Sequence, residues 1–532
     1  MLFPTIEFAA FLLVVLVASW LLMPNPRLWK PFIIVVSLAF YGWTDARWAL
    51  LLVASIVITV VAAALVARTA DPGRRKAWLV TLIVVDLGLL GVFKYYGFFV
   101  DSAASVLDRI GLGMPLPLLS IALPIGISFF TFQSISYVVD VYRGDYPLAR
   151  AVDVAVYLSF FPHVVAGPIV RAREFIPQLA SPRDPRRIPA TAAFFLIAGG
   201  LVKKVVIADY LAVSIVDPVF GSPAAASSTD TLVAILGYAA QIYCDFSGYT
   251  DIAIGVAMLL GFRFPQNFNG PYRATDLQEF WRRWHMTLSR WLRDYLYIPL
   301  GGSRRGTGRT YVNLMITMLL GGLWHGASWT FVVWGAIHGT GLVVQRAFES
   351  WQARRSGASA DAADGADDES PGDGAPLPDE GAFPAGMPLP ATVDVEDLVD
   401  APARRRLALR RPPEQRGSAV VPVLASWLLT FAVVCFAWVF FRAPDVEVAL
   451  EVLGRLVTGG STETRYVSAT VLLAVLVGLG SQFVPSRWWR AVERRFSRLP
   501  LLWQGVLLGT VIVLATSLFP ETGVAPFIYF RF

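Results

Sequence analysis

Residues 48–67 read WALLLVASIVITVVAAALVA, twenty consecutive positions without a charged side chain. A bilayer core of about 30 Å requires about 20 apolar residues in a helix, so this stretch predicts a transmembrane helix. Together with other apolar runs, it predicts an all-α polytopic membrane protein of about 10–12 transmembrane helices, some broken or re-entrant. The other runs lie at residues 8–23, 31–43, 78–93, 116–139, 191–213, 232–261, 420–441, 467–483 and 501–519.

The overall composition agrees with a membrane protein. Hydrophobic residues make up 55% of the 532-residue chain and charged residues 16%, whereas about a quarter of a typical soluble domain is charged. These values exclude a disordered chain, a coiled coil and a small disulfide scaffold. Both cysteines, Cys244 and Cys435, lie in apolar segments, which excludes a disulfide framework. The arginines lie between apolar helices rather than on one polar face, which argues against a nucleic-acid partner.

One stretch departs from the apolar pattern. Residues 356–403 contain 12 of the 39 acidic residues and no Lys or Arg. Their Ala-, Asp-, Gly- and Pro-rich composition predicts a disordered loop. We therefore divide the chain into a membrane core at residues 1–350, with a catalytic region at 241–338, the acidic loop at 356–403, and C-terminal transmembrane helices of the same core at 419–532.

The positions of Lys and Arg predict the orientation in the membrane. Cytoplasmic loops of membrane proteins carry an excess of these residues. Alternation through the expected spans places all the basic segments, and the acidic loop, on the cytoplasmic face and both termini on the other face. The basic segments are residues 68–76, 171–187, 263–309, 354–416 and 487–498.

The first polar cluster lies in an otherwise apolar helix, at residues 241–251. A charge at the centre of a membrane helix costs roughly 2.5–3.5 kcal/mol, so such residues are kept for a reason. Tyr243, Asp245 and Ser247 are candidates for binding a substrate along a reaction tunnel. An equally good interpretation is that they form interhelical hydrogen bonds that lock the helix bundle.

The second cluster, at residues 278–290, combines Arg, Trp and Leu in a pattern typical of an amphipathic helix at the cytoplasmic interface. Arg282 and Arg283 are predicted to face lipid headgroups or a phosphate-bearing donor. His285 can share a helical face with Arg282 or with Ser289. Taken alone, His285 is more simply interpreted as an interfacial histidine.

The third cluster follows a short apolar run at residues 311–320. A helix of that length spans only about 15 Å and cannot cross the bilayer. We therefore expect a glycine-rich bend through Gly321, Gly322 and Gly326, followed by a longer helix, that presents Trp324 and His325 at membrane depth. A dry histidine stays neutral, and a neutral imidazole is a competent general base.

The other two histidines are assigned packing roles. His338 follows His325 by thirteen residues on the next helix, and His163 lies in a segment at residues 152–170 that Pro162 and Pro168 should break. The sequence contains no metal-ligand spacing of the HExxH type and no glycine-rich phosphate loop.

Several of these segments resemble the membrane-bound O-acyltransferase (MBOAT) superfamily, in particular the bacterial branch that acts in alginate O-acetylation and in D-alanyl transfer to teichoic acid. The resemblance runs through nearly the whole chain, apart from the acidic loop. It rests on FKYYGFF (93–99), LPIGISFFTFQ (123–133), FFPHVVAGPIVR (160–171), YCDFSGYTDIA (243–253), FPQNFN (264–269), FWRRWHMTLS (280–289), LWHG (323–326) and WVFFRA (438–443).

The resemblance implies an O-acyltransferase of the MBOAT fold in the bacterial inner membrane. The donor would be a cytoplasmic acyl thioester, either acetyl-CoA or an acyl carrier protein, with no bound cofactor. The acceptor would be a hydroxyl of an exported polysaccharide or cell-envelope polymer. His325 matches the central histidine of the family and His285 the second, while Asn267 falls in a matching motif and is expected to contact substrate. Oxyanion donors would be His285 or backbone N–H groups near Gly322.

The resemblance also implies partners. In this branch an extracytoplasmic acyltransferase or the polysaccharide itself receives the acyl group, and residues 527–532 are a candidate docking tail. Two alternatives remain open at this point. A transporter or channel would use the polar residues to line a permeation path, and a structural scaffold for a polysaccharide synthase would have no use for His325.

Overall fold

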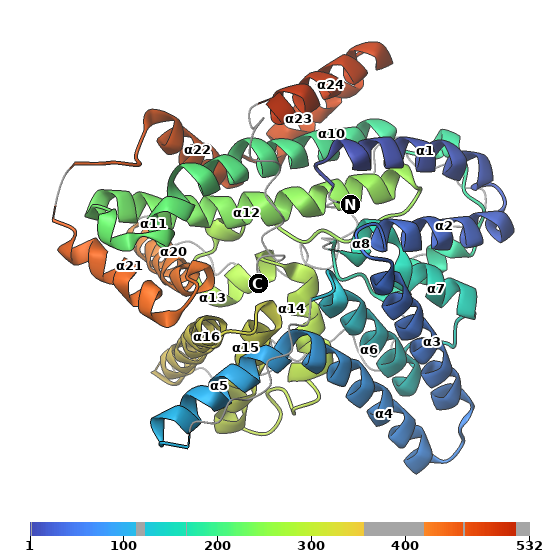
Figure 1. The fold of residues 1–532 in the computed structure, drawn as a ribbon, viewed down its shortest axis with the longest axis horizontal. Helices are drawn as coiled ribbons and strands as arrows, with labels where there is room; N and C mark the ends of the chain where they lie inside the picture. The colour runs from blue at the N-terminus through green and yellow to red at the C-terminus, as the bar shows by residue number, and fades with distance from the viewer. Residues whose placement is uncertain (2, 113–122, 166, 356–419, 461–462, 518–532) are drawn as a thin grey trace.

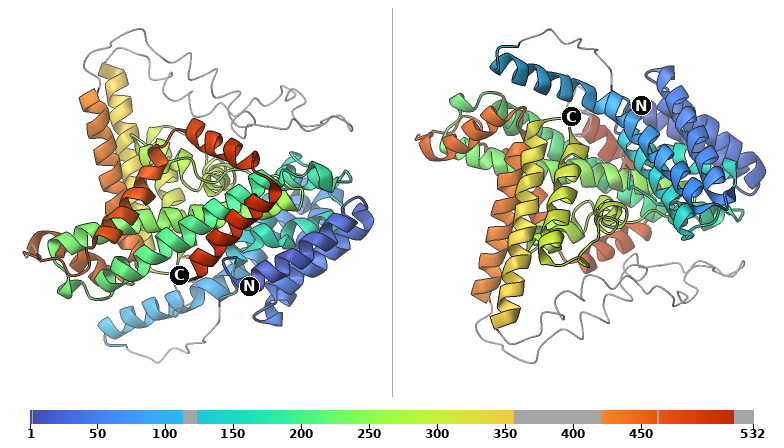
Figure 2. Two further views of the ribbon diagram at one scale, coloured as in Figure 1. Left: turned by 90° about the horizontal axis from the view of Figure 1, so that it is seen from above. Right: turned by 90° about the horizontal axis from the view of Figure 1, so that it is seen from below.

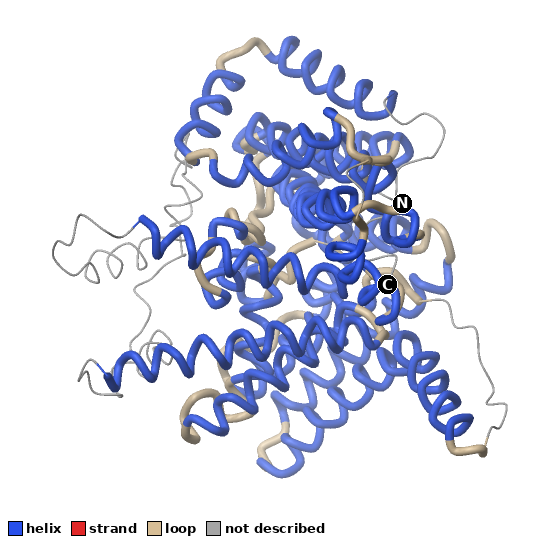
Figure 3. The backbone as a smooth tube through the Cα atoms, turned by 90° about the vertical axis from the view of Figure 1, so that its left-hand side faces the viewer, coloured by secondary structure: helices blue, strands red, loops and turns tan. Residues whose placement is uncertain are grey.

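The computed structural model describes residues 1, 3–112, 123–165, 167–355, 420–460 and 463–517. The described ranges contain helices and loops but no strand (Figure 3). The first part of the chain forms α1 (Ile6–Leu22), α2 (Pro26–Tyr41), α3 (Ala46–Arg68), α4 (Pro72–Leu90), α5 (Tyr96–Arg109), α6 (Ile127–Arg143), α7 (Ala151–Ser159), α8 (Phe161–Val164), α9 (Ala172–Phe175), α10 (Ala190–Leu201), α11 (Asp217–Gly221) and α12 (Ser228–Leu259).

The second part forms α13 (Leu277–Arg283), α14 (Met286–Leu292), α15 (Thr307–His325), α16 (Trp329–Arg355), α20 (Val420–Arg442), α21 (Val446–Thr458), α22 (Ala469–Gly480), α23 (Ser486–Ser497) and α24 (Leu501–Ser517). Wider π-helical turns lie at η1 (Gly91–Tyr95), η4 (Val202–Asp209), η5 (Ala212–Val216) and η8 (Arg293–Tyr297). Such turns are rare in proteins and are frequent at functional sites.

Polar residues mark where several helices begin. The side chain of Asp45 accepts a hydrogen bond from the Arg47 backbone N–H before α3, and Asp71 does the same for Arg74 before α4. Ser227 and Asp230 cap α12 reciprocally. These caps satisfy N–H groups that have no partner inside the helix, so each start is encoded locally.

By length and composition, four described helical segments could cross a membrane, or five if one bent pair is counted. This number is lower than the total of about 10–12 transmembrane helices expected from the apolar runs. The difference has a physical reason, since α12 is 32 residues long but carries polar residues that lower its hydropathy, and α1 has only 17 residues. The four segments are Ala46–Arg68, Pro72–Arg109, Ala190–Gly221 and Pro422–Arg442.

Helix α12 runs through the middle of the bundle, with α10 and η4 alongside it (Figure 1). Two glycines allow this close approach. A Cβ atom on Gly200 would meet the Gly248 carbonyl oxygen at 2.6 Å, and one on Gly248 would meet the Gly200 carbonyl oxygen at 2.7 Å. Small residues are the usual device for bringing membrane helices together. Helix α20 also packs against α12, and α16 lies beside α20 (Figure 2).

The broken segment predicted at residues 152–170 is confirmed. It forms α7 and the one-turn helix α8, separated at Phe160, where ψ is 108°. The acidic loop at 356–403 and the candidate docking tail at 527–532 lie outside the described residues.

Candidate active site

Helix α15 differs from its prediction. It extends over 19 residues, from Thr307 to His325, or about 28 Å, and it continues through Gly321 and Gly322. The expected short helix is therefore wrong, and so is a bend at Gly321 and Gly322, but the chain does break at Gly326, after which the longer helix α16 begins. The glycines allow α15 and α16 to pack closely instead, because a Cβ atom on Gly322 would collide with the Phe331 carbonyl oxygen. Because Gly322 lies inside the helix, its N–H takes part in intrahelical hydrogen bonding and is a poor candidate for an oxyanion donor.

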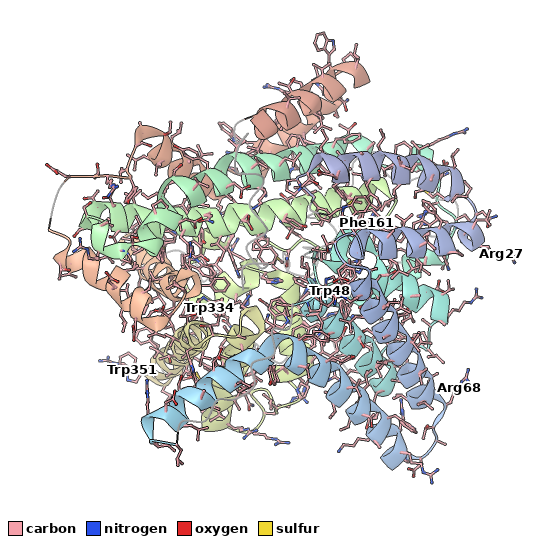
Figure 4. The ribbon with its side chains drawn as sticks, in the orientation of Figure 1. Arg27, Trp48, Arg68, Phe161, Trp334 and Trp351 are labelled. Carbon is pink, nitrogen blue, oxygen red and sulfur yellow. The ribbon has the colours of Figure 1, made fainter. Side chains whose placement is uncertain are left out.

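His325 is the last residue of α15 and is only 2% exposed. Three aromatic rings surround its imidazole. The ring centroids of Trp324, Trp334 and Phe441 lie 5.1, 4.9 and 5.1 Å from that of His325, all in edge-to-face arrangements. Figure 4 shows Trp334 inside the bundle. Trp324, Trp334 and Phe441 come from α15, α16 and α20, so three helices contribute to the aromatic surroundings of His325.

His285 also differs from its prediction. The sequence predicted one amphipathic helix through residues 278–290, but the structure has two helices, α13 and α14, with His285 between them. Its φ is +42°, and it is the single described non-glycine residue with a positive φ. A non-glycine residue in the left-handed region stores strain and is frequent at functional sites. The helical faces expected to join His285 with Arg282 or Ser289 therefore do not form.

Asn267 holds the segment that carries His285. The Thr287 backbone N–H and hydroxyl donate to Asn267 Oδ1 at 3.1 and 2.9 Å. His285 Nδ1 lies 3.2 Å from the same oxygen. The backbone donor of Thr287 identifies that atom as the oxygen, which accepts only. Nδ1 of His285 is therefore the protonated nitrogen, and a neutral His285 has its lone pair on Nε2.

Trp324 joins the two histidines. Its ring centroid lies 5.1 Å from that of His325 and 5.9 Å from that of His285. His285 is fully buried and also contacts the ring of Phe246 at 4.7 Å. The structure thus brings together four of the residues predicted from the sequence. Trp324 and His325 end α15, His285 lies between α13 and α14, and Asn267 lies in the loop before α13.

The family of this chain follows from comparisons of its sequence with known proteins. The family model described as "MBOAT, membrane-bound O-acyltransferase family" matches residues 148–363, which include both histidines. The chain is also similar to the peptidoglycan O-acetyltransferase of Helicobacter pylori, with 33% identity over 462 residues, 81% of this chain and 74% of the relative. The chain belongs to the membrane-bound O-acyltransferase family. This confirms the resemblance inferred from the motifs.

Two further relatives extend the comparison. The "Probable alginate O-acetylase AlgI" of Azotobacter vinelandii is 50% identical over 273 residues, 51% of this chain and 54% of the relative. The teichoic acid D-alanyltransferase of Bacillus subtilis is 27% identical over 242 residues, 43% of this chain and 60% of the relative. The match therefore spans little more than half the length of the alginate relative.

The other predicted site residues of this MBOAT chain have different surroundings. Asp245 forms an ion pair with Lys204 at 2.5 Å, and Lys204 also pairs with Asp209 at 2.7 Å. Ser247 accepts a hydrogen bond from Lys203. These contacts between α12 and η4 favour the bundle-locking interpretation of Asp245. The Tyr243 ring lies 6.1 Å from that of Phe268, which in turn lies 6.4 Å from the ring of His285.

The two candidate arginines lie away from the histidine rings. Arg282 is exposed, and Arg283 donates to Glu279 Oε1 at 2.7 Å and to the Asn269 carbonyl oxygen at 3.1 Å. Any contact between these arginines and a donor would take place where the protein meets solvent or headgroups rather than beside His325.

His338 and His163 occupy packing positions. The His338 ring lies 4.8 Å from that of Trp334, which in turn contacts His325. His163 Nε2–H donates to the Tyr157 carbonyl oxygen at 2.8 Å. His338 therefore supports the wall of the site, while His163 fixes the break between α7 and α8.

Sequence reasoning missed Lys94, which contacts the end of α15. Its Nζ donates to the carbonyl oxygens of Trp324 and His325. A signal was present, because Lys94 is a basic residue directly after the apolar run at residues 78–93, and ionisable residues at membrane depth are functional candidates by default. Lys203 and Lys204 carried the same signal.

Proposed function

We propose that this chain transfers an acyl group, an acetyl group by analogy with its alginate and peptidoglycan relatives, to a hydroxyl of an exported polysaccharide or another cell-envelope polymer. The donor would be a cytoplasmic thioester, either acetyl-CoA or an acyl carrier protein, and the enzyme would act in the bacterial inner membrane. The observation that carries the proposal is the buried pair His325 and His285, which share contact with Trp324 in a member of this family.

His325 is assigned the role of general base. An alcohol is a poor nucleophile at neutral pH, so its proton must leave as the oxygen attacks. The imidazole of His325 takes the hydroxyl proton while the oxygen bonds to the thioester carbonyl carbon. The tetrahedral intermediate then collapses, the C–S bond breaks, and the proton passes from the imidazolium to the leaving sulfur. The products are an ester and a free thiol, so the step consumes no additional reactant.

His285 is assigned a supporting role. With Nδ1–H directed to Asn267, its neutral ring presents an acceptor nitrogen at Nε2. An acceptor can hold the hydroxyl of the incoming alcohol or a thiol, but it cannot donate to an oxyanion. Its role in this proposal is therefore to orient a reactant beside His325, rather than the oxyanion role implied by the resemblance.

The aromatic lining suits this chemistry. Trp324, Trp334 and Phe441 offer little hydration to the imidazole of His325. A site that excludes water strengthens electrostatic interactions within it and protects a reactive thioester from hydrolysis. The polymer, or an extracytoplasmic acyltransferase that passes the group on, would approach from the side opposite to the donor.

The deciding experiment compares His325→Ala with His338→Ala in a strain that lacks the chromosomal gene. Ester-linked acetate released from surface polymer by mild alkali measures activity, and immunoblotting of membranes measures protein. We expect His325→Ala to lower acylation by about 10²–10⁴-fold at a parental protein level, because general-base catalysis typically contributes that much. His338→Ala should be milder, since it acts through Trp334.

Two outcomes would count against this assignment. If His325→Ala retains acylation within a few-fold of the parent at equal protein level, His325 is not the base. If His338→Ala is the more damaging change, the base lies one helix further along. A parent that restores no acylated polymer would contradict the transferase function itself.

A further inference from the structure

Lys94 lies in the π-helical turn η1, directly after α4. Helix α4 has 19 residues, or about 28 Å, which is close to the thickness of the bilayer core. The basic residues Arg74, Arg75 and Lys76 lie at its other end. After η1 the chain leaves in a new direction as α5 (Figure 1). Lys94 therefore lies about one membrane crossing away from the basic start of α4.

Two side chains of η1 contact the backbone at the end of α15. Lys94 Nζ donates to the Trp324 carbonyl oxygen at 2.5 Å and to the His325 carbonyl oxygen at 3.2 Å. The phenol of Tyr95 donates to the Leu323 carbonyl oxygen at 2.7 Å. Three successive carbonyl groups of the last turn of α15 thus accept hydrogen bonds from side chains of the same π-helical turn, η1.

These donors matter because of where α15 ends. The last four carbonyl groups of a helix have no partner inside the helix. A glycine just after a helix commonly adopts the left-handed conformation, so that backbone N–H groups that follow the helix donate to these carbonyl groups. Gly326 does not, because its backbone is extended with φ −161°, and its N–H makes only a long bond of 3.4 Å to the Gly322 carbonyl oxygen. The cation of Lys94 is also favourable at the negative end of the helix dipole.

We propose that Lys94 is a positioning residue, which fixes the last turn of α15 and through it the imidazole of His325, with Tyr95 as a neutral helper. The inference rests on the proposed role of His325 as the base. Lys94 binds the backbone carbonyl groups of Trp324 and His325, and in this way it sets the orientation of both rings. Lys94 itself takes no part in the reaction, because the reacting atoms belong to His325. It also lies 5.9 Å from the centroid of the Trp324 ring, which it helps to hold by a cation–π contact.

The competing interpretation is that the carbonyl groups of Trp324 and His325 merely offset the free energy lost when the Lys94 ammonium group is buried. In that case Lys94 would contribute to stability but would not affect the chemical step. The two interpretations differ in what a neutral replacement of similar length should do to turnover, donor binding and the order of the last turn.

The first test measures turnover and donor binding with purified protein in nanodiscs, acetyl-CoA as donor and de-acetylated surface polymer as acceptor. We expect Lys94→Met to lower kcat by about 10–100-fold, with the KM for acetyl-CoA within about threefold of the parent, because the lost hydrogen bonds orient the base and do not hold the donor. Tyr95→Phe should lower kcat by about threefold. The matched control is Lys30→Met, which removes a lysine of α2 that pairs with Asp153.

Chemical rescue separates a positioning ammonium from general damage. Alkylation of the Lys94→Cys protein with 2-bromoethylamine rebuilds an ammonium group at nearly the length of lysine. The native cysteines, Cys244 and Cys435, are buried and should not react. We expect kcat to recover by at least about fivefold on alkylation, with no gain for Lys94→Met treated in the same way. No recovery after confirmed alkylation would overturn the proposal.

A second readout does not depend on activity. Amide hydrogen exchange followed by mass spectrometry should show faster exchange at residues 322–326 in Lys94→Met, with α16 unchanged, because release of the carbonyl groups lets the last turn fray. Unchanged exchange there would overturn the proposal, and so would faster exchange with an unchanged kcat. If the parent transfers no acetyl group, the proposed function fails, while the exchange data still decide whether Lys94 anchors this turn.

Discussion

Two buried polar clusters lie within the same helix bundle, and they are built in different ways. The lysine cluster between η4 and α12 consists of full charges in direct contact. Lys204 pairs with Asp209 and Asp245, and Lys203 pairs with Asp251. The histidine cluster around Trp324 is built from aromatic rings and hydrogen bonds to the backbone. Its rings are surrounded by aromatic edges, and its backbone is held by Asn267 and Lys94.

The difference shows that polarity in the membrane serves two purposes in this chain. A paired charge is stable only with its partner, so the lysine cluster fixes how η4 and α12 fit together. A neutral imidazole does not need a counter-charge, so its position can be set by packing and by the backbone while the ring keeps its capacity to exchange protons. Substitutions in the first cluster should therefore damage the fold, and substitutions in the second should damage activity.

The largest effect is expected from Lys204→Met. It leaves Asp209 and Asp245 facing each other across the lost ammonium group, and removal of one partner from a buried pair costs about 3–5 kcal/mol. We expect the variant to fail to accumulate in membranes, as measured by immunoblotting and by fluorescence-detected gel filtration.

The comparison variant is Lys203→Met, because the Lys203 side chain is 22% exposed and pairs with a partly exposed Asp251. It should accumulate at a reduced but measurable level. Normal accumulation and melting of Lys204→Met would show that the lysine cluster does not lock the bundle.

The second effect concerns the packing that supports the histidine cluster. Gly322→Ala places a methyl group against the Phe331 carbonyl oxygen, a rigid backbone atom of α16. Overpacking of this kind costs about 1–3 kcal/mol and should displace the end of α15. We expect a lower melting temperature together with a loss of acylation that exceeds the loss of folded protein.

Gly321→Ala is the matched control, because its added methyl group meets only Leu292 Cδ1 at 3.3 Å, the flexible end of a side chain. The control should behave like the parent or melt slightly higher, since alanine is the better helix former. Equal behaviour of the two variants would show that close packing of α15 on α16 is unimportant for the site.

The sequence predicted the parts of this molecule that depend on local pattern. The apolar run at residues 48–67 forms α3, and the prolines of residues 152–170 accompany a broken segment. The structural role of the glycines was ambiguous in the sequence, because a glycine such as Gly322 is compatible both with a bend and with close helix packing. The choice depends on Phe331, nine residues away in the chain and on another helix.

The site was predicted in its residues but not in its geometry. His325 and His285 were recognised because ionisable residues are rare in apolar segments and because their motifs resemble a family. The left-handed backbone of His285 depends on Asn267, eighteen residues earlier. The anchor from Lys94 joins residues more than two hundred positions apart. Contacts over such distances are tertiary, and no local pattern encodes them.

The third effect concerns Asn267→Ala, which removes the side-chain oxygen that accepts hydrogen bonds from the Thr287 backbone N–H and from His285 Nδ1. We expect kcat to fall about tenfold, equivalent to about 1.4 kcal/mol, because His285 loses the bond that sets its tautomer and angle. Gln266→Ala is the neighbouring control, since the Gln266 side chain is exposed and donates to the Phe268 carbonyl oxygen. A change of stability without any change in kcat would limit Asn267 to a structural role.

The smallest effect is expected from the arginines of α13, and it tests their predicted contact with a phosphate-bearing donor. Arg283 already pairs with Glu279, and exposed ion pairs contribute only about 0.2–1 kcal/mol. We therefore expect Arg283→Gln to leave the KM for acetyl-CoA within about twofold of the parent value.

Arg282 is exposed, so Arg282→Gln should raise the KM for acetyl-CoA by up to about fivefold if the Arg282 guanidinium contacts a phosphate of the donor. Such a contact is screened by salt, so the difference between Arg282→Gln and the parent should shrink as ionic strength rises from 0.05 to about 0.5 M. An unchanged KM at low salt would show that Arg282 does not contact the donor. A loss of kcat that does not depend on salt would instead show that Arg282 acts in the chemical step, together with the histidine cluster.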